Sequence, residues 1–425
     1  MISVLFGSLL AFFALSVPIA ISIGASTLLA LFSSSIPPTV LVQKMFTAMD
    51  SFPLMAVPFF ILAGALMETG GISRRLVNFA NTFVGHFAGG LAFVAIIASM
   101  FFGAISGAAV ACVAAIGGVL IPEMVSHGYG KPYTAAVQAT AGTLGVMIPP
   151  SIPMIIYGVM TGVSVGGLFM GGVLPGIFVG FSLIAVAWVI ARKNGYRGDQ
   201  RYSWRSRWKA FKEAFWALLM PVIILGGIYG GVFTPTEAAV VAVVYGLFVG
   251  FFVYRELQVQ QIKSIFVKTA VSTAVVMFII GASSAFSWVI TAHHIPQMVT
   301  KALLSITTNK ILILILINLL LLFIGTFMET VASIIILVPV LLPVVTAIGV
   351  DPLHFGIVLV VNLAIGMVTP PLGVCLFVSC SIADITLEDI TRAAIPFILV
   401  MIVDIFILTF VPALSTFLPR AMGLC

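Results

Sequence analysis

Two stretches of this chain place a Pro-Pro pair inside a long apolar segment: 145–151 (GVMIPPS) and 366–372 (GMVTPPL). Proline has no backbone N–H and pushes the preceding residue into extended geometry, so a helix cannot continue through either pair. The break leaves backbone carbonyls before it and N–H groups after it without partners. Lipid does not tolerate such groups, so they must face protein or a water-filled cavity. Two breaks in corresponding halves of a membrane chain indicate an ion and substrate site at the bilayer midplane.

Oxygen atoms near the two breaks have the chemistry of a Na⁺ site. Backbone carbonyls at the end of a helix carry its negative dipole end, and small hydroxyl side chains add further oxygen ligands. The sequence has no Asp/Glu pair and no His relay at these positions, which favours Na⁺ over H⁺ as the coupling ion. We expect no other metal and no cofactor. The predicted Na⁺ ligands are Gly103, Ser106, Thr143, Gly145, Ile148, Gly325, Thr326, Met328, Thr330, Gly366 and Thr369.

Backbone N–H groups at the start of the following helices suit the carboxylate of an organic acid, because helix N-termini attract anions. No Arg lies at the predicted binding depth, so recognition would rest on N–H groups and hydroxyls. The predicted substrate-binding residues are Ser106, Gly107, Pro150, Ser151, Thr330 and Pro371. Close helix packing is the alternative explanation for the small residues among them.

Acidic residues in the apolar segments allow two interpretations. Glu329 lies near one of the predicted sites, and a carboxylate inside a membrane marks a functional site by default. Pairing with a nearby donor is the alternative. Glu237, in the sequence TPTE, suits the start of a helix, because acidic side chains stabilise helix N-termini. The roles of Glu68, Glu123 and Asp404 stay open.

The composition places these residues in a membrane protein that crosses the bilayer several times. Of the 425 residues, 61% are hydrophobic and only 8% are charged, whereas about 25% of a soluble domain is charged. The net charge of +6 does not indicate nucleic-acid binding, because the basic residues gather in one segment, 192–213. The four cysteines have no metal-binding spacing. The apolar N-terminus has no basic residue before it and predicts a retained membrane segment.

Glycine and proline recur at constant offsets along the chain. At an offset of 221 the pairs are Pro122 and Pro343, Gly128 and Gly349, Gly145 and Gly366, Pro149 and Pro370, Pro150 and Pro371, and Pro175 and Pro396. At an offset of 217 they are Pro18 and Pro235, and Gly64 and Gly281. Because these residues determine backbone shape, their coincidence predicts two halves of one architecture, 1–190 and 214–425, joined by a basic linker at 191–213.

Before each break the sequence is typical of a re-entrant hairpin. The apolar runs 91–102 and 108–121 are each about 20 Å long as helix, too short for a hydrocarbon core of about 30 Å. A turn at 103–107 (GAISG) separates them, and the corresponding turn is 325–330 (GTFMET). The predicted hairpins are 88–124 and 311–345, and the predicted broken helices are 132–162 and 352–381.

The other apolar segments predict membrane-spanning helices. They are 2–17, 19–35, 53–72, 168–190, 214–233, 235–254, 269–292 and 394–417. A single tilted helix is the alternative for the first two. A loop or surface helix is expected at 36–52, and amphipathic connectors at 255–268, at 295–310 and from Arg74 onward.

The basic residues orient this arrangement. With the linker 191–213 in the cytoplasm, most of the 19 Lys and Arg residues lie on the cytoplasmic side, as the positive-inside rule requires. The odd number of crossings in each half then gives the two halves opposite orientations in the membrane. The hairpins enter from opposite sides, and their tips and both breaks meet at the midplane.

At these positions the chain resembles the large membrane subunit of the TRAP (tripartite ATP-independent periplasmic) transporters. The matching stretches are 101–111 (FFGAISGAAVA), 142–158 (GTLGVMIPPSIPMIIYG), 233–239 (FTPTEAA), 325–330 (GTFMET) and 362–377 (NLAIGMVTPPLGVCLF). The resemblance covers essentially the whole chain. One departure from a perfect repeat is Ile148 opposite Thr369, so the two ion sites should not be equivalent.

The resemblance implies an all-α membrane fold with an inverted repeat and an elevator mechanism, in which a transport domain carrying both hairpins slides against a scaffold. It implies Na⁺ coupling in a bacterial inner membrane. It also implies a four-helix small membrane subunit and a periplasmic binding protein that delivers an organic acid, such as a C4-dicarboxylate, sialic acid or another sugar acid. Segments 2–35 and 214–254 carry few polar groups and are expected to receive the small subunit.

Other functions remain to be weighed against this one. A stand-alone Na⁺/dicarboxylate symporter of the same type would need no binding protein. A passive channel would show neither Na⁺ dependence nor saturation, and a pure scaffold subunit would not need two broken helices. An intramembrane enzyme would need paired Asp, a Ser/His pair or a metal-binding His-Glu-x-x-His, and none occurs at suitable depth.

Overall fold

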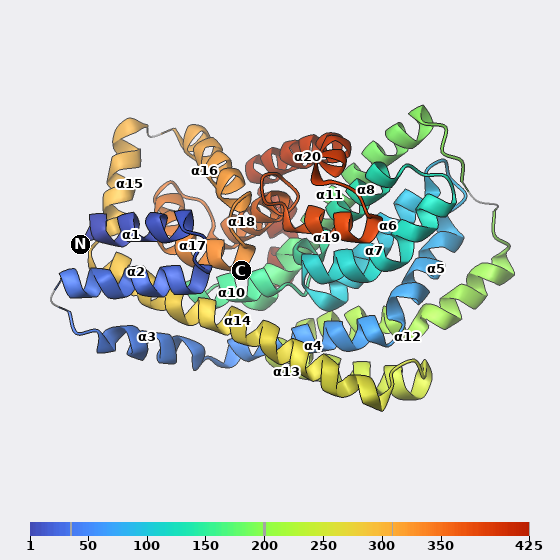
Figure 1. Ribbon diagram of the computed structural model, residues 1–425, viewed down its shortest axis with the longest axis horizontal. Helices are drawn as coiled ribbons and strands as arrows, with labels where there is room; N and C mark the ends of the chain where they lie inside the picture. Colours follow the sequence, from blue (N-terminus) through green and yellow to red (C-terminus); the bar gives the residue numbers. More distant parts are fainter. Residues whose placement is uncertain (35, 199–200, 308, 425) are drawn as a thin grey trace.

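The computed structural model describes residues 1–34, 36–198, 201–307 and 309–424, which form helices and contain no strand. The elongated molecule has most of its long helices aligned with its longest axis (Figure 1). In the first half the elements are α1 (Ile2–Ala14), α2 (Ile19–Ser33), α3 (Thr39–Met49), η1 (Phe52–Met55), α4 (Ala56–Thr69), α5 (Ile72–Val84), α6 (Gly90–Ser106), α7 (Ala109–Ser126), α8 (Lys131–Gly142), α9 (Leu144–Met147), α10 (Ile152–Thr161) and α11 (Val165–Lys193).

The second half begins after the linker. Its elements are α12 (Trp204–Tyr229), α13 (Pro235–Phe248), η2 (Val249–Val253), α14 (Val259–Ala292), α15 (Ile295–Ile306), α16 (Lys310–Gly325), α17 (Thr330–Ala347), α18 (Pro352–Gly366), α19 (Val374–Ala383), α20 (Leu387–Phe410) and α21 (Ala413–Ala421). Linker residues 199 and 200, and the C-terminal Cys425, lie outside the described residues.

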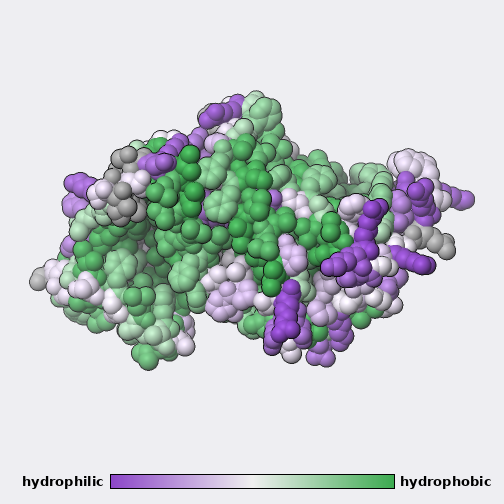
Figure 2. Space-filling view, turned by 90° about the horizontal axis from the view of Figure 1, so that it is seen from above, coloured by the Kyte–Doolittle hydropathy of each residue, from purple (hydrophilic) through white to green (hydrophobic). Residues whose placement is uncertain are grey.

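Nine helical segments within the described ranges are long and apolar enough to cross a membrane. The surface agrees with this interpretation. Figure 2 shows apolar side chains over most of one face, with hydrophilic side chains gathered mainly toward one end. A protein with so much exposed apolar surface is stable only where lipid or a partner covers it. The prediction of an all-helical membrane protein with many spans is therefore confirmed.

Three predicted boundaries were wrong. The connector 255–268 is not a separate element, because α14 continues from Val259 to Ala292, with neither Gly nor Pro before Gly281 to interrupt it. The basic linker is shorter than 191–213, because Ser203 caps α12 and the helix begins at Trp204. The last span lies seven residues earlier than 394–417. Thr386 caps the start of α20, and at its end Val411, which precedes Pro412, leaves helical geometry with φ −118° and ψ 75°, as the residue before a proline tends to do.

The expected length of the hairpin limbs was also wrong. The run 108–121 was judged too short to cross a membrane, but α7 has 18 residues. Its counterpart α17 also has 18 residues. Both helices continue through internal prolines, Pro122 in α7 and Pro339 and Pro343 in α17, because a proline-interrupted turn can be supported by the helices packed around it. Re-entry of the hairpins from opposite membrane sides stays a prediction.

The N-terminal segment forms two helices rather than one. α1 and α2 pack against each other, and α2 packs against α14 (Figure 1). They share a small separate core with the end of α14, built on buried side chains that include Leu5, Ile23 and Phe286. The bend between them includes Ser16, whose φ is +57°, followed by Val17 and Pro18. A proline after a left-handed residue ends a helix efficiently.

Two groups of helices make up the rest of the molecule. In the first, α4 packs against α13 and α14, and α5 packs against α12. Arg75 ties this group together, since its guanidinium lies 2.7 Å from the Glu256 carboxylate and 3.7 Å from the centroid of the Tyr254 ring. In the second group, the two hairpins and the broken helices interlock. α7 and α8 pack against α19, and α17 packs against α10 and α18.

Glycines let each hairpin approach its own broken helix at backbone distance. A Cβ on Gly103 would lie 2.8 Å from Cα of Gly145, and a Cβ on Gly366 would overlap the carbonyl carbon of Gly325. Real Cβ atoms do not tolerate such contacts, and all of the nearest atoms are backbone. The pairs Gly103–Gly145 and Gly325–Gly366 therefore bring the end of a hairpin limb onto the residues just before each break.

Substituting Gly366 tests this contact. Gly366→Ala should destabilise the protein by about 1–3 kcal/mol, because an overpacked site forces the backbone apart, and the thermal midpoint in detergent should fall. Gly226→Ala is the matched control. It also lies in a helix, no atom stands within 4 Å of the position that its new methyl group would take, and alanine favours helix by up to about 1 kcal/mol. Equal midpoints for the two variants would contradict the close contact.

Candidate functional site

The α6–α7 junction lies against the first break. Gly107 ends α6 with φ +64° and donates its N–H to the carbonyl of Gly103 at 3.1 Å. Its own carbonyl accepts the N–H of Ile152, the first residue of α10, at 3.2 Å. A Cβ on Gly107 would lie 2.8 Å from the Pro150 carbonyl oxygen. The hairpin tip is thus hydrogen-bonded to the chain just after the Pro-Pro pair.

The α16–α17 junction repeats this contact at the second break. The carbonyl of Thr326 accepts the N–H of Leu372 at 3.2 Å. The junction itself is closed by the N–H of Met328, which donates to the Ile324 carbonyl at 3.0 Å. Both Pro-Pro bonds, 149–150 and 370–371, are cis. The two halves therefore use one arrangement, a hairpin tip bonded to the residues that follow a Pro-Pro pair.

Both tips open onto one cavity of about 350 Å³. Residues 107–111 from the first tip and 329–331 from the second line it, together with Ile152 and Pro153 from α10. Ser272 and Val276 of α14 and Ile61 of α4 contribute to another part of its wall. The two tips, 221 residues apart in the chain, are therefore brought together by the fold.

Two hydroxyl groups predicted as ligands have no hydrogen-bond partner. Ser106 and Thr330 are each 2% exposed, and neither side-chain oxygen has a partner within the described residues. Buried polar atoms nearly always have a partner, so both hydroxyls have hydrogen-bonding capacity left for a water, an ion or a ligand. Thr330 lines the cavity directly, whereas Ser106 lies one residue behind it, next to Gly107.

Three other predicted hydroxyls are bonded to their own helices. Each donates its proton to a carbonyl three or four residues earlier: Thr143 to Thr140 at 2.7 Å, Thr326 to Phe323 at 2.7 Å, and Thr369 to Ile365 at 2.8 Å. A hydroxyl that has donated its proton keeps its lone pairs available. This geometry suits a cation ligand better than a donor to an acid.

The predicted substrate residues separate into two groups. Gly107 and Thr330 line the cavity, whereas Ser106, Pro150, Ser151 and Pro371 are not among its lining residues. Ser151 has a structural task instead, since it caps α10 by accepting the N–H of Met154 and donates to the Val146 carbonyl at 2.6 Å. The sequence motif alone could not separate a capping serine from a ligand.

The N-termini of α7 and α17, which both meet this cavity, differ in their caps. Glu329 caps α17, where its carboxylate accepts the N–H groups of Val331 at 2.8 Å and Ala332 at 3.2 Å. At α7 the capping position is Ala108, and no side chain caps the helix. The sequence contained a signal for this difference, because Ala108 and Glu329 are related by the repeat offset of 221. Although the tips were expected to meet at the midplane, the apolar side chains of Ala108–Ala111 gave no sign that these residues line the cavity.

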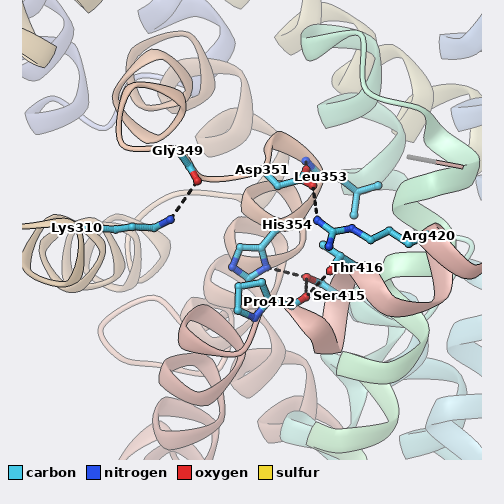
Figure 3. A network of polar contacts seen from close by, with 9 residues as sticks. All are labelled: Lys310, Gly349, Asp351, Leu353, His354, Pro412, Ser415, Thr416 and Arg420. Atoms are coloured by element: carbon cyan, nitrogen blue, oxygen red, sulfur yellow. Dashed lines mark hydrogen bonds and ion pairs between the residues drawn. The ribbon is translucent and has the colours of Figure 1, made fainter.

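A second polar cluster holds the far end of α18 in place (Figure 3). Asp351 caps the helix by accepting the Leu353 N–H at 2.8 Å, and its other oxygen lies 3.7 Å from the Arg420 guanidinium. The buried ring of His354 bridges the Ser415 hydroxyl at 2.7 Å and the Thr409 carbonyl at 3.2 Å. These contacts anchor α18 to α20 and α21, so the break that follows at Gly366 has a fixed position.

The other acidic residues singled out in the sequence do not line the tip cavity. Glu237 forms a capping box with Thr234 at the start of α13, as its position predicted. Asp404 accepts a hydrogen bond from Ser182 at 3.0 Å between α20 and α11. Within the described ranges, no three His, Cys, Asp or Glu side chains could jointly hold a metal ion.

Comparison with known proteins decides the family. Residues 6–414 match the family described as "Tripartite ATP-independent periplasmic transporter, DctM component". The chain belongs to this family. It is 39% identical to the C4-dicarboxylate TRAP transporter large permease protein DctM of Rhodobacter capsulatus, over 99% of both chains. It is 47% identical to the isethionate TRAP transporter permease protein DctMQ of Oleidesulfovibrio alaskensis, over 97% of this chain and 66% of that relative.

The fold of this DctM-family chain is similar to a solved transporter of distant sequence. The crystal structure of the Alcanivorax borkumensis YdaH transporter matches 88% of this chain and 87% of its own with a TM-score of 0.62, at 15% identity. At that identity the likeness shows the fold alone. The family resemblance inferred from the sequence is confirmed, and its curated members are named permeases rather than enzymes.

Removing the Glu329 carboxylate should uncap α17. We expect Glu329→Ala to cost about 1–2 kcal/mol of stability, because two buried N–H groups lose their acceptor. Glu329→Asp should retain most of the stability, since aspartate is a good capping residue. Thermal midpoints of the detergent-solubilised protein would show the difference, and an alanine variant as stable as the aspartate variant would contradict a capping role.

Proposed function

We propose that this chain is the permease of a Na⁺-coupled TRAP transporter that imports an organic acid. The observation that supports this best is the shared cavity, whose lining includes a helix N-terminus without a side-chain cap and Thr330, whose buried hydroxyl has no partner among the described residues. Such a site offers N–H donors and a hydroxyl to an anion. The cavity is bounded on one side by α4 and α14, which belong to the first of the two helix groups, the one in which α4 packs against α13 and α14.

The acid group of the substrate binds at the N-terminus of α7 in this proposal. The N–H groups of Ala109, Val110 and Ala111 have no intrahelical acceptor there and carry the positive end of the helix dipole. At α17 the same place is already taken by the carboxylate of Glu329. Relatives of this chain are named for isethionate, C4-dicarboxylate, sialic acid and 2,3-diketo-L-gulonate, all of which are organic acids.

Na⁺ would bind at the carbonyls and hydroxyls next to each break. The hydroxyls of Thr143, Thr326 and Thr369 present lone pairs there, because their protons are donated to helix carbonyls. A bound cation would also offset the charge of Glu329, which otherwise repels an acid in the same cavity. Ion binding would thereby favour substrate binding, which is the coupling that symport requires.

Transport would follow an elevator movement. The hairpins and broken helices interlock through α7, α8, α10, α17 and α19, so they would move as one body. α4, α5, α12, α13 and α14 would form the scaffold. The cavity has walls from both groups, so sliding one group past the other would open it toward one side of the membrane at a time.

The partners and location follow from the family. A periplasmic binding protein would deliver the substrate, and a small membrane subunit would cover exposed apolar side chains of α12, α13 and α14, such as Val222, Val244 and Phe266. The remaining apolar surface would contact lipid of the bacterial inner membrane. The basic linker would lie in the cytoplasm.

Uptake into proteoliposomes tests this function. With the small subunit and binding protein present, uptake of a transported acid should require both an inward Na⁺ gradient and the binding protein. The variants Ser106→Ala and Thr326→Val should raise the Na⁺ concentration needed for half-maximal uptake. Uptake without the binding protein would favour a stand-alone symporter, and uptake independent of Na⁺ would overturn the ion sites.

Introducing a negative charge at the uncapped N-terminus of α7 tests whether the acid group of the substrate binds there. Ala108→Glu puts a carboxylate where Glu329 stands in the other half, and it should raise the KM for the acid at least about tenfold through competition and like-charge repulsion. Ala108→Gln has nearly the same size without the charge and is the matched control. Equal KM values for the two variants would show that the acid binds elsewhere.

A further inference from the structure

A second and larger cavity lies beyond the tip cavity. Its volume is about 540 Å³, and its wall includes residues of α3, α10, α14, α15 and α17, in the half of the molecule that contains the N-terminus (Figure 1). Polar side chains contribute to its wall from several elements: Thr47, Ser51, Ser284, Ser287, Thr291 and Gln297. The function proposed above does not use any of them.

The two cavities lie in series along the same three helices. α14 contributes Ser272 and Val276 to the tip cavity and the residues from Ile280 to Thr291 to the second one. α10 and α17 continue in the same way, from Ile152 to Met160 and from Glu329 to Pro343. The helices run on without interruption between the two sets of residues. The second cavity therefore lies beyond the tip cavity toward the C-terminal ends of α10, α14 and α17.

The wall contains both donors and acceptors of hydrogen bonds. Thr47 and Thr291 donate their hydroxyl protons to the carbonyls of Gln43 and Ser287, both at 2.9 Å, and keep their lone pairs free. Ser284 and Ser287 make no side-chain hydrogen bond to any described residue, so their O–H groups are free to donate. With Thr291 they form one row on α14, at a spacing that places three residues on the same helix face.

This set matches a particular class of molecule. Acid oxygens accept hydrogen bonds from the serines, whereas hydroxyl groups of a ligand donate to the threonines. None of the lining residues is charged, so binding would be weak and release easy. Lys44 lies one turn before Thr47, with its Nζ 5.5 Å from the ring centroid of Trp288. Asp50, exposed and next to Ser51, partly offsets that charge.

We propose that this cavity is a vestibule that binds hydroxylated organic anions before they reach the tip cavity. The hydroxyls of Thr47 and Thr291 accept hydrogen bonds from the hydroxyl groups of the ligand, so the cavity selects hydroxy acids, sugar acids and hydroxyalkane sulfonates over acids of the same length without a hydroxyl. The inference rests on the proposed function, since it treats the tip cavity as the transport site.

Removing the threonine acceptors tests the selection. The double variant Thr47→Val/Thr291→Val should raise the KM for the hydroxylated acid about tenfold, through the loss of uncharged hydrogen bonds, with the maximal rate nearly unchanged. Malate against succinate and isethionate against ethanesulfonate are the pairs to compare. The KM for the acid without a hydroxyl should change little. An unchanged KM, or the same change for both members of a pair, would overturn the proposal.

A labelling experiment tests the vestibule without transport. Ser287→Cys should react with a negatively charged, membrane-impermeant methanethiosulfonate added on the side away from the linker, and malate or isethionate should slow the reaction several-fold without Na⁺. The parent protein gives the background, since Cys112, Cys375 and Cys380 are buried. Ser305→Cys, at the exposed end of α15, is the unprotected control.

The labelling result separates this inference from the proposed function. Protection of Ser287→Cys in a protein that shows no Na⁺-driven uptake would leave the vestibule standing and the transport proposal refuted. Absence of protection, or equal protection by succinate or ethanesulfonate, would refute the vestibule even if uptake is Na⁺-driven.

Discussion

The backbone contact between each hairpin tip and its broken helix is the constraint on which the site depends. Glycines at 103 and 145, and at 325 and 366, let two helix ends meet without side chains between them. Single hydrogen bonds, Ile152 to Gly107 and Leu372 to Thr326, then lock each tip to the chain after the Pro-Pro pair. Because buried backbone groups in an apolar medium must be satisfied, these bonds help to make the interrupted helices tolerable. They also hold both tips where they line one cavity.

The two halves share this framework but carry different chemistry. At the second tip the protein supplies its own carboxylate, Glu329, to the helix N-terminus. At the first tip Ala108 leaves that position open. The shared cavity therefore has one helix N-terminus without a side-chain cap and one that carries a carboxylate.

The surrounding helices hold this site and lead to it. The cluster around His354 and Asp351 fixes the outer end of α18, while the ion pair between Arg75 and Glu256 ties α5 to the segment between η2 and α14. α14 forms a wall of both cavities. The hydroxyl row on α14 is thus placed where an anion would pass on its way to the tips.

The sequence by itself determined the class of protein and the position of the breaks. Composition required a membrane, and proline cannot continue a helix, so the breaks at Pro149–Pro150 and Pro370–Pro371 follow from local chemistry. The repeated glycines and prolines indicated two related halves, and the motifs identified the family. These properties depend on single residues or on short segments, and therefore they can be read from the chain alone.

Only the tertiary structure decided which side chains share a space. Ser151 and Thr330 are both hydroxyl residues that the sequence predicted as substrate ligands. In the structure Ser151 caps α10, whereas Thr330 lines the cavity and its hydroxyl has no partner among the described residues. The uninterrupted course of α14 could not be read from its amphipathic start at 255–268, because packing against α2, α3 and α4 stabilises it as one helix. Burial, capping and the cavity shared by tips more than two hundred residues apart depend on the whole fold, since no local pattern encodes the neighbour that a side chain will meet.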